Sequence, residues 1–242
     1  MQSITERQQE ILMAIIKEFM SSADEVGSLA LLEKYNLGVS SATIRNEMAR
    51  LMEMGLLEKS HISSGRYPTD QALRMYVSNI LGSTSLNPLI TVEIRQGIFR
   101  ERFSKETVID SILKILSEET ESIAFVVIEG KCKYWGVSNI FKYEELRNWE
   151  KLQRIFNILE SSNFLSNMMS KYSGSGVSLV IGEESGIKGM GECAMIFTRL
   201  PFWGTENAHI GLLGSKRMDY AKCIPALREV QSSMKNAMMG WS

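Results

Sequence analysis

Apolar residues recur at helical spacing in three successive segments of the N-terminal third of the chain. Residues 5–20, 28–35 and 40–54 each place apolar side chains three or four positions apart, and this period predicts three helices. Thr5 and Gln8 have the spacing of a capping box at the start of the first helix. Gly38 is typical of a helix stop, and a glycine-containing turn before the third helix predicts a helix-turn-helix.

Residues 56–68 predict a two-stranded ribbon, with apolar anchors on either side of a Ser-Ser-Gly turn at residues 63–65. A ribbon in this place is typical of the wing of a winged helix. Thr69 then caps a further helix whose apolar side lies outside a minimal winged helix. We predict that this side meets a second subunit, and packing against its own domain is the alternative. The residues concerned are Leu73, Tyr76, Val77 and Ile80.

The second half of the chain mixes strand and helix patterns. Residues 82–88 are rich in Gly, Ser, Thr, Asn and Pro, and we predict a linker over residues 83–104 between domains at 1–82 and 105–242. The pattern favours an α+β fold for the second domain, with a central, mostly antiparallel sheet and helices on one side. The predicted strands are 123–128, 133–140, 177–181, 194–200 and 209–213, and the predicted helices are 105–119, 144–160 and 219–239.

The third helix carries an unusual polar face. The side chains of its first turns are small, carry hydroxyl groups or can pair with base edges. Small side chains suit DNA reading, because a helix must approach the floor of the major groove closely to read it. Arginine can pair with guanine and asparagine with adenine, while hydroxyl groups suit phosphates. The alternatives are an ordinary surface helix and, for His61, a solvated loop histidine. The predicted DNA-binding residues are Ser41, Thr43, Arg45, Asn46, Arg50, His61 and Arg66.

The charge of the chain argues against strong non-specific binding to DNA. The formal net charge is −1, and residues 1–81 hold eight basic and ten acidic side chains. The acidic residues concentrate before Gly38, where they can face away from DNA. A dimer that positions a few cations well remains compatible with this balance.

The sequence carries no pattern that indicates an enzyme, a cofactor or a metal site. Glycines between residues 174 and 191 fit turns and match no phosphate-binding motif. Two histidines, His61 and His209, lie far apart, and His209 in an apolar strand is typical of the core. The three cysteines lack C-x-x-C spacing, so we expect reduced structural thiols in a cytoplasmic protein. No apolar run approaches the roughly 20 residues that a membrane span needs.

Motifs spread over nearly the whole chain resemble one known family. They are 5–8, 26–28, 38–46, 55–58, 61–69, 136–139, 181–184 and 211–220. Together they resemble the heat-inducible transcription repressor (HrcA) family of bacteria. This chain departs from the family at Ser60, where proline is usual, at Ala72, where glycine is common, and at residues 161–176, which replace a longer inserted subdomain that contributes to the family's dimer surface. We therefore interpret the chain as a compact member.

The resemblance implies a repressor of chaperone operons. The family binds an inverted-repeat DNA operator, called CIRCE, as a homodimer through a winged helix, and its C-terminal domain is GAF-like. A GroEL-type chaperonin is the implied partner that keeps the repressor active, and heat inactivates it. The family's DNA-contacting motif carries over onto Ser41, Thr43, Arg45, Asn46 and Arg66. The alternative function is a winged-helix regulator whose GAF-like domain senses a small molecule.

Overall fold

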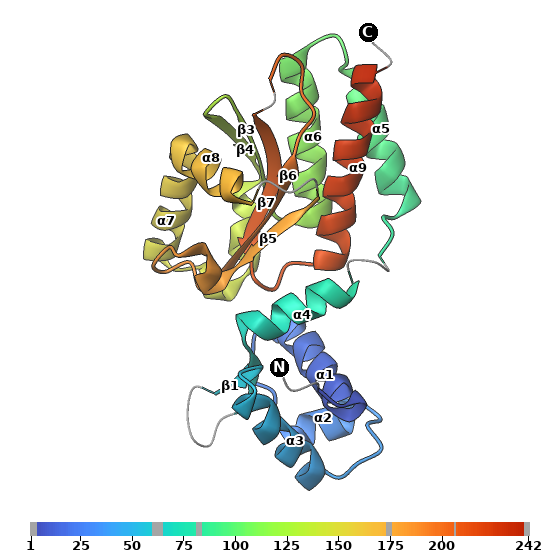
Figure 1. The fold of residues 1–242 in the computed structure, drawn as a ribbon, viewed down its shortest axis with the longest axis vertical. Coiled ribbons are helices and arrows are strands. Elements are labelled where there is room, and N and C mark those ends of the chain that lie inside the picture. The colour runs from blue at the N-terminus through green and yellow to red at the C-terminus, as the bar shows by residue number, and fades with distance from the viewer. Residues whose placement is uncertain (1–3, 60–64, 81–83, 173–175, 206, 240–242) are drawn as a thin grey trace. The chain divides into compact units, whose positions relative to one another are not determined.

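A computed structural model describes residues 4–59, 65–80, 84–172, 176–205 and 207–239 of the chain. These residues divide between two compact units, Met1–Gly82 and Ser83–Ser242 (Figure 1). The mixture of helices and antiparallel strands confirms the predicted α+β class. Of the helices described, none is long and apolar enough to cross a membrane.

The N-terminal unit begins with three helices and a short two-stranded antiparallel sheet. The capping box predicted for the first helix is present: the Gln8 amide donates to Thr5 Oγ1 (3.2 Å), and the Thr5 amide donates to Gln8 Oε1 (3.0 Å). Thr69 Oγ1 accepts from the Ala72 amide, which confirms its predicted capping role. The elements are α1 (Glu6–Ser22), α2 (Ser28–Lys34), α3 (Ser41–Glu53), β1 (Leu57–Glu58), β2 (Tyr67–Pro68) and α4 (Asp70–Ile80).

Helix α4 corrects part of the predicted dimer surface. Leu73 and Val77 are only 0% and 1% exposed within the single chain, and α4 contacts α1 and β2 of its own unit. A side chain that is already covered in one chain has no surface left for a second subunit. The alternative, packing against its own domain, therefore holds for these two residues. Tyr76 and Ile80 are half-buried, and their role at a dimer surface stays a prediction.

The C-terminal unit is built around an antiparallel sheet with the strand order β4-β3-β7-β6-β5. Helices α6 and α9 cover one face and α7 and α8 the other, so the prediction of helices on one side was wrong (Figure 1). Both faces of β3 are apolar, and the strand is buried on both. The strands are β3 (Ile123–Ile128), β4 (Lys131–Trp135), β5 (Ser178–Ile181), β6 (Cys193–Arg199) and β7 (Ala208–Ser215), and the helices are α6 (Lys105–Thr120), α7 (Trp149–Glu160), α8 (Ser162–Lys171) and α9 (Tyr220–Met239).

The predicted linker at 83–104 is mostly a helix, α5 (Pro88–Arg100). Asn87 caps it by accepting from the Leu89 amide (2.9 Å), and Pro88 occupies its first position, where a missing amide costs nothing. Gly97 lets α5 approach α6 closely, because a Cβ at this position would lie 2.7 Å from Ile115 Cδ1. The helix therefore belongs to the C-terminal unit, where it packs against α6 and α9.

Two boundaries in the C-terminal unit also differ from prediction. Strand β4 stops at Trp135 because Gly136 takes a positive φ of 80°, and a 3-10 helix (Val137–Lys142) follows in place of the rest of the predicted strand. The side-chain nitrogen of Asn139 holds this turn by donating to the carbonyls of Ser117 and Ser122, each at 3.1 Å. The predicted helix 144–160 is a short 3-10 turn (Glu144–Leu146) followed by α7, and α8 was not predicted.

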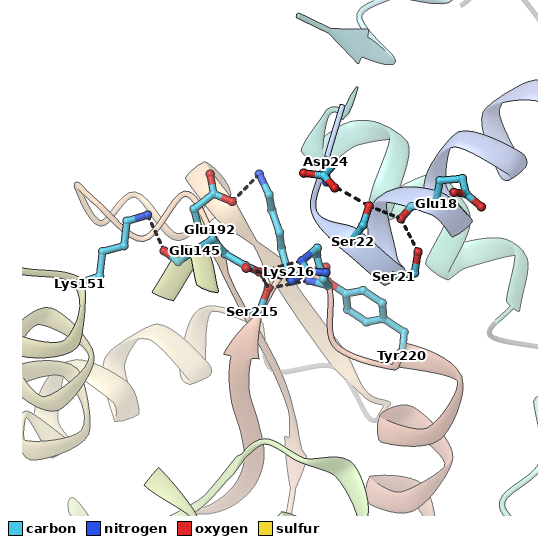
Figure 2. Close-up of polar contacts among 11 residues, drawn as sticks. Glu18, Ser21, Ser22, Asp24, Glu145, Lys151, Glu192, Ser215, Lys216 and Tyr220 are labelled. Atoms are coloured by element: carbon cyan, nitrogen blue, oxygen red, sulfur yellow. Dashed lines mark hydrogen bonds and ion pairs between the residues drawn. The ribbon is translucent and has the colours of Figure 1, made fainter. Parts of the chain in front are cut away.

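A partly buried charge cluster fixes the connection between β7 and α9. Arg217 donates to both carboxylate oxygens of Glu145 (2.9 and 3.0 Å), and the Ser215 hydroxyl donates to the same carboxylate. Figure 2 shows Lys216 extending toward Glu192, with which it forms an ion pair at 3.3 Å. Burial alone raises the pKa of Glu145, but the hydrogen bonds from Arg217 and Ser215 outweigh it and lower the pKa below its usual value.

Candidate nucleic-acid interface

The N-terminus of α3 is fixed by hydroxyl groups. Ser40 caps the helix by accepting from the Thr43 amide (3.2 Å), and the Ser40 and Thr43 hydroxyls lie 3.0 Å apart. The Ser41 hydroxyl lies 3.0 Å from that of Ser28, which is buried at the start of α2. The first turn of α3 is thereby joined to α2, and the two helices keep a fixed relation. Thr43 and Ser41 remain half-exposed at this end.

The inner face of α3 combines apolar packing with one buried carboxylate. Ile44, Met48 and Leu51 are buried, and Glu47 lies among them. Glu47 Oε2 accepts from Gln8 Nε2 of α1 (2.9 Å), and Glu47 Oε1 accepts from Arg50 Nη1 (3.3 Å). This chain of contacts ties α1 to α3 and holds the Arg50 side chain toward the helix to which it belongs.

The outer face of α3 is available for a ligand. Arg45 and Asn46 are exposed, and no other residue in the described ranges forms a hydrogen bond or ion pair with either of their side chains. Ala42 and Ala49, on the same face, are also exposed and add little bulk around them. A binding partner whose surface carries hydrogen-bond donors and acceptors can therefore approach Arg45 and Asn46 closely. The base edges of a DNA major groove have this chemistry.

The second predicted contact region lies beside β2, and only part of it is described. His61 falls within residues 60–64, which lie outside the described residues. Arg66 pairs through its backbone with Val26, its side chain is half-buried, and Arg66 Nη1 donates to the Gly65 carbonyl (3.0 Å). Arg66 is therefore partly packed and hydrogen-bonded within its own unit. Gly65 is needed here because a Cβ would lie 2.8 Å from the Glu25 backbone.

Helix α3 carries five of the predicted residues: Ser41, Thr43, Arg45, Asn46 and Arg50. Arg66 lies apart from them in the chain, directly before β2. Sequence reasoning missed Gln8 and Glu47 as positioning residues. The signal for Glu47 was present, since a helical projection places it within the apolar stripe of α3. Its partner was not predictable, because Gln8 lies 39 residues earlier.

The three cysteines are held as neutral thiols. Burial raises the pKa of Cys132 to about 11. Burial is also the largest cause of the raised pKa values of Cys193 and Cys223, which are both about 12. All three are therefore neutral thiols near pH 7, and the thiolate is the reactive form. Each of them is free of a disulfide. They act as small apolar residues of the C-terminal unit.

Comparison with known proteins identifies the family. The sequence model described as "HrcA protein C terminal domain" matches residues 48–224. The chain belongs to the HrcA family. That match begins within α3 and ends in α9, so it extends over both units. HrcA relatives are named as transcription repressors, which is a non-enzymatic role.

Relatives of known name align with almost the whole chain. The heat-inducible transcription repressor HrcA of Clostridium botulinum (strain Eklund 17B) is 25% identical over 98% of this chain and 98% of its own length. The HrcA of Symbiobacterium thermophilum is 39% identical over 51% of this chain and 36% of its own length. The alignment with the C. botulinum protein runs to 339 positions, although this chain has 242 residues. That HrcA protein therefore contains residues without a counterpart here.

One solved structure shares the fold over the full length. A protein described as "hypothetical", solved at 2.2 Å resolution, superposes with a TM-score of 0.83 at 19% identity and covers 99% of this chain and 100% of its own. This likeness shows that the fold of this HrcA-family chain has been observed in another protein.

Proposed function

We propose that this protein represses heat-shock genes by binding a CIRCE-type inverted-repeat DNA operator through α3. One observation carries the proposal: Arg45 and Asn46 stand exposed and side by side on a capped helix, with small residues around them, in a chain of the HrcA family. These two side chains are the types that pair with guanine and adenine through two hydrogen bonds. Repression follows because bound protein occludes transcription.

In this proposal the N-terminal unit is a winged helix-turn-helix. Helix α3 enters the major groove, with Arg45 and Asn46 reading base edges. The hydroxyl of Thr43 and the free amides of the first turn contact phosphates, as does Arg50 from the flank. Ser41 positions the helix through Ser28 and, together with His61 and Arg66 from the wing, completes the contact surface.

The C-terminal unit is the GAF-like regulatory and dimerisation domain of the proposal. Two copies of the chain place two α3 helices on the two half-sites of a palindrome, because the symmetry of a dimer matches that of an inverted repeat. Heat releases the DNA by loosening this unit or the dimer. A GroEL-type chaperonin is the proposed partner that maintains the active form, and the cytoplasm is the proposed location. The ligand-sensing alternative stays a prediction.

The test is a gel shift with a CIRCE-type inverted repeat and a scrambled duplex, at physiological salt and at two temperatures. We expect preference for the repeat, weaker at the higher temperature. Arg45→Ala and Asn46→Ala should each reduce that preference by roughly 5- to 150-fold, since a bidentate base contact is worth about 1–3 kcal/mol. Lys17→Ala, which removes an exposed positive charge from α1, is the matched control and should keep the preference.

Two results contradict the proposal. Equal, salt-sensitive binding to both duplexes shows that the protein binds DNA without this target. Unchanged preference in the correctly folded Arg45 and Asn46 variants shows that α3 does not read the bases. Circular dichroism of each variant establishes that the fold is intact.

A further inference from the structure

Helix α5 carries apolar side chains on two opposite faces. Its inner face, Ile90, Ile94, Gly97 and Ile98, is buried against α6 and α9. Its outer face, which we call the outer stripe, has a repeat of three and four residues and contains Leu89, Val92, Gln96, Phe99 and Phe103. A soluble helix that already buries one apolar face normally turns a polar face to water. The outer stripe is therefore unusual and needs a separate explanation.

The outer stripe is strongly exposed. Leu89 is 77% exposed, Phe99 is 63% exposed and Phe103, just beyond the end of the helix, is 87% exposed. The two phenylalanine rings lie close together, because the Arg102 guanidinium stacks over both, at 4.0 and 4.3 Å from their centroids. Contiguous exposed apolar surface of this kind marks interaction sites in soluble proteins.

The spacing of the outer stripe fits a second helix. Positions 89, 92, 96 and 99 follow the a and d pattern of a heptad, in which two helices meet along one seam, and Phe103 extends the same apolar surface beyond the last residue of α5. Helix α5 packs on α6 and α9 with the opposite side, and the Arg95–Glu229 ion pair (2.8 Å) helps to fix it there. Only the outer stripe is left to form such a seam.

The charges beside the outer stripe identify a second copy of this chain as the partner. In an antiparallel pair of α5 helices centred on Gln96, Val92 meets Phe99 of the other copy across the seam, since the two lie four and three residues from the centre. Glu93 and Arg100 lie three and four residues from the centre on the same flank of the seam, so Glu93 of one copy is within reach of Arg100 of the other, and symmetry repeats this contact. The two Gln96 amides meet at the axis, where each can both donate and accept a hydrogen bond. Glu93 and Arg100 are both exposed and available for these pairs.

We propose that two copies of this chain associate through the outer stripes of their α5 helices, antiparallel and centred on Gln96. The surface is isologous, as a two-fold axis requires. A seam this short makes a small interface, so we expect a dimer that dissociates at micromolar concentrations in the absence of DNA. A dimer is part of the proposed function, but the outer stripe as its interface is a separate claim and is tested without DNA.

The experiment is sedimentation equilibrium of the full chain over a range of concentrations. Phe99→Glu should weaken self-association at least tenfold, because it replaces a large apolar side chain of the seam with a charge. Trp149→Glu is the matched control, since Trp149 is also a strongly exposed aromatic residue, at the start of α7. It should leave the dissociation constant unchanged.

A charge exchange tests the antiparallel register. Glu93→Arg and Arg100→Glu, each alone, bring like charges together twice in the dimer and should weaken it several-fold. The double variant Glu93→Arg/Arg100→Glu restores opposite charges and should restore wild-type association. A partner other than a second copy cannot produce this rescue.

Three outcomes would overturn the proposal: a wild-type chain that stays monomeric throughout, a dimer indifferent to Phe99→Glu, or a double variant as weak as the single ones. Each is separable from a failure of the proposed function. A monomer that still prefers the inverted repeat keeps the repressor assignment and removes this interface. A dimer that forms through the outer stripe but shows no operator preference keeps this interface and removes the repressor assignment.

Discussion

The side-chain nitrogen of Gln8 donates a hydrogen bond to Glu47 Oε2 at 2.9 Å, joining α1 to α3 across 39 residues of sequence. Both side chains are buried. A buried polar group that loses its partner retains the cost of leaving water, whereas replacing both partners by apolar groups is nearly neutral. This contact therefore influences both the stability of the N-terminal unit and the placement of α3.

Glu47→Ala should lower the free energy of unfolding by about 1–3 kcal/mol, because Gln8 is left without its acceptor. The double variant Gln8→Leu/Glu47→Leu should recover part of that loss; it also removes the capping-box hydrogen bond from the Thr5 amide to Gln8, so the recovery is incomplete. Glu53→Ala, an exposed change on the same helix, should stay within about 0.5 kcal/mol of the wild type. Urea denaturation measures all three. A double variant less stable than Glu47→Ala would show that Glu47 does not stabilise the fold through its hydrogen bond with Gln8.

Gly65→Ala should destabilise the N-terminal unit by about 1–3 kcal/mol, because the new Cβ would lie 2.8 Å from the Glu25 backbone and force the chain to shift. Gly176→Ala is the control, since a Cβ there meets nothing within 4 Å. Thermal unfolding followed by circular dichroism compares the two. Equal melting temperatures would mean that the connection around Glu25 yields without cost.

Arg217→Met should lower the free energy of unfolding by about 1–3 kcal/mol, because it leaves the partly buried Glu145 carboxylate without its charged partner. Glu145→Gln/Arg217→Met should be less damaging, since no charge is left uncompensated. Arg147→Met removes an exposed arginine whose ion pair with Glu144 is 3.8 Å long, and it should change stability by less than about 1 kcal/mol.

The same carboxylate gives acid sensitivity. Because the pKa of Glu145 is lowered in the folded chain, its contribution is present above the unfolded value of about 4.3 and is lost as pH falls through the folded pKa. The Glu145→Gln/Arg217→Met variant should therefore show a shallower loss of stability below about pH 4.3 than the wild type. An identical acid profile in both proteins would contradict this assignment.

His209 predicts a second pH effect, at milder acidity. Burial, and secondarily the positive charge of Arg199, lowers the pKa of His209, so the unfolded chain takes up the proton more readily. Stability should be unaffected well above pH ~6.5 and should fall as pH drops below it. His209→Gln should flatten that decline in urea unfolding at a series of pH values.

The sequence predicted correctly those elements that are determined by residues close together in the chain. The α3 stripe, the Thr5–Gln8 capping box and the Thr69 cap all depend on residues within four positions of one another, and the structure shows each. Strand β3 was predicted to the residue because its run of β-branched and aromatic side chains ends at a turn. The candidate site on α3 was predictable for the same reason, since one helix carries most of it.

Helix α5 was missed for a physical reason. Apolar residues on both faces blur the helical period, so Leu89, Ile90, Val92 and Ile94 form a mixed run in which no single stripe stands out. The shortened β4 depended on the backbone of Gly136, and the partner of Glu47, Gln8, lies in another helix. These features depend on contacts between residues far apart in the sequence, and a window of neighbouring residues does not contain such contacts.

The strand order β4-β3-β7-β6-β5 imposes an order on synthesis. Strand β7 joins the β3–β4 hairpin to the β5–β6 pair, yet it is the last of the five to be translated. Until Ser215 has left the ribosome, the C-terminal unit consists of two separate strand pairs with exposed apolar faces. The N-terminal unit holds its own partners within the first 82 residues and is able to fold while the rest is still being made.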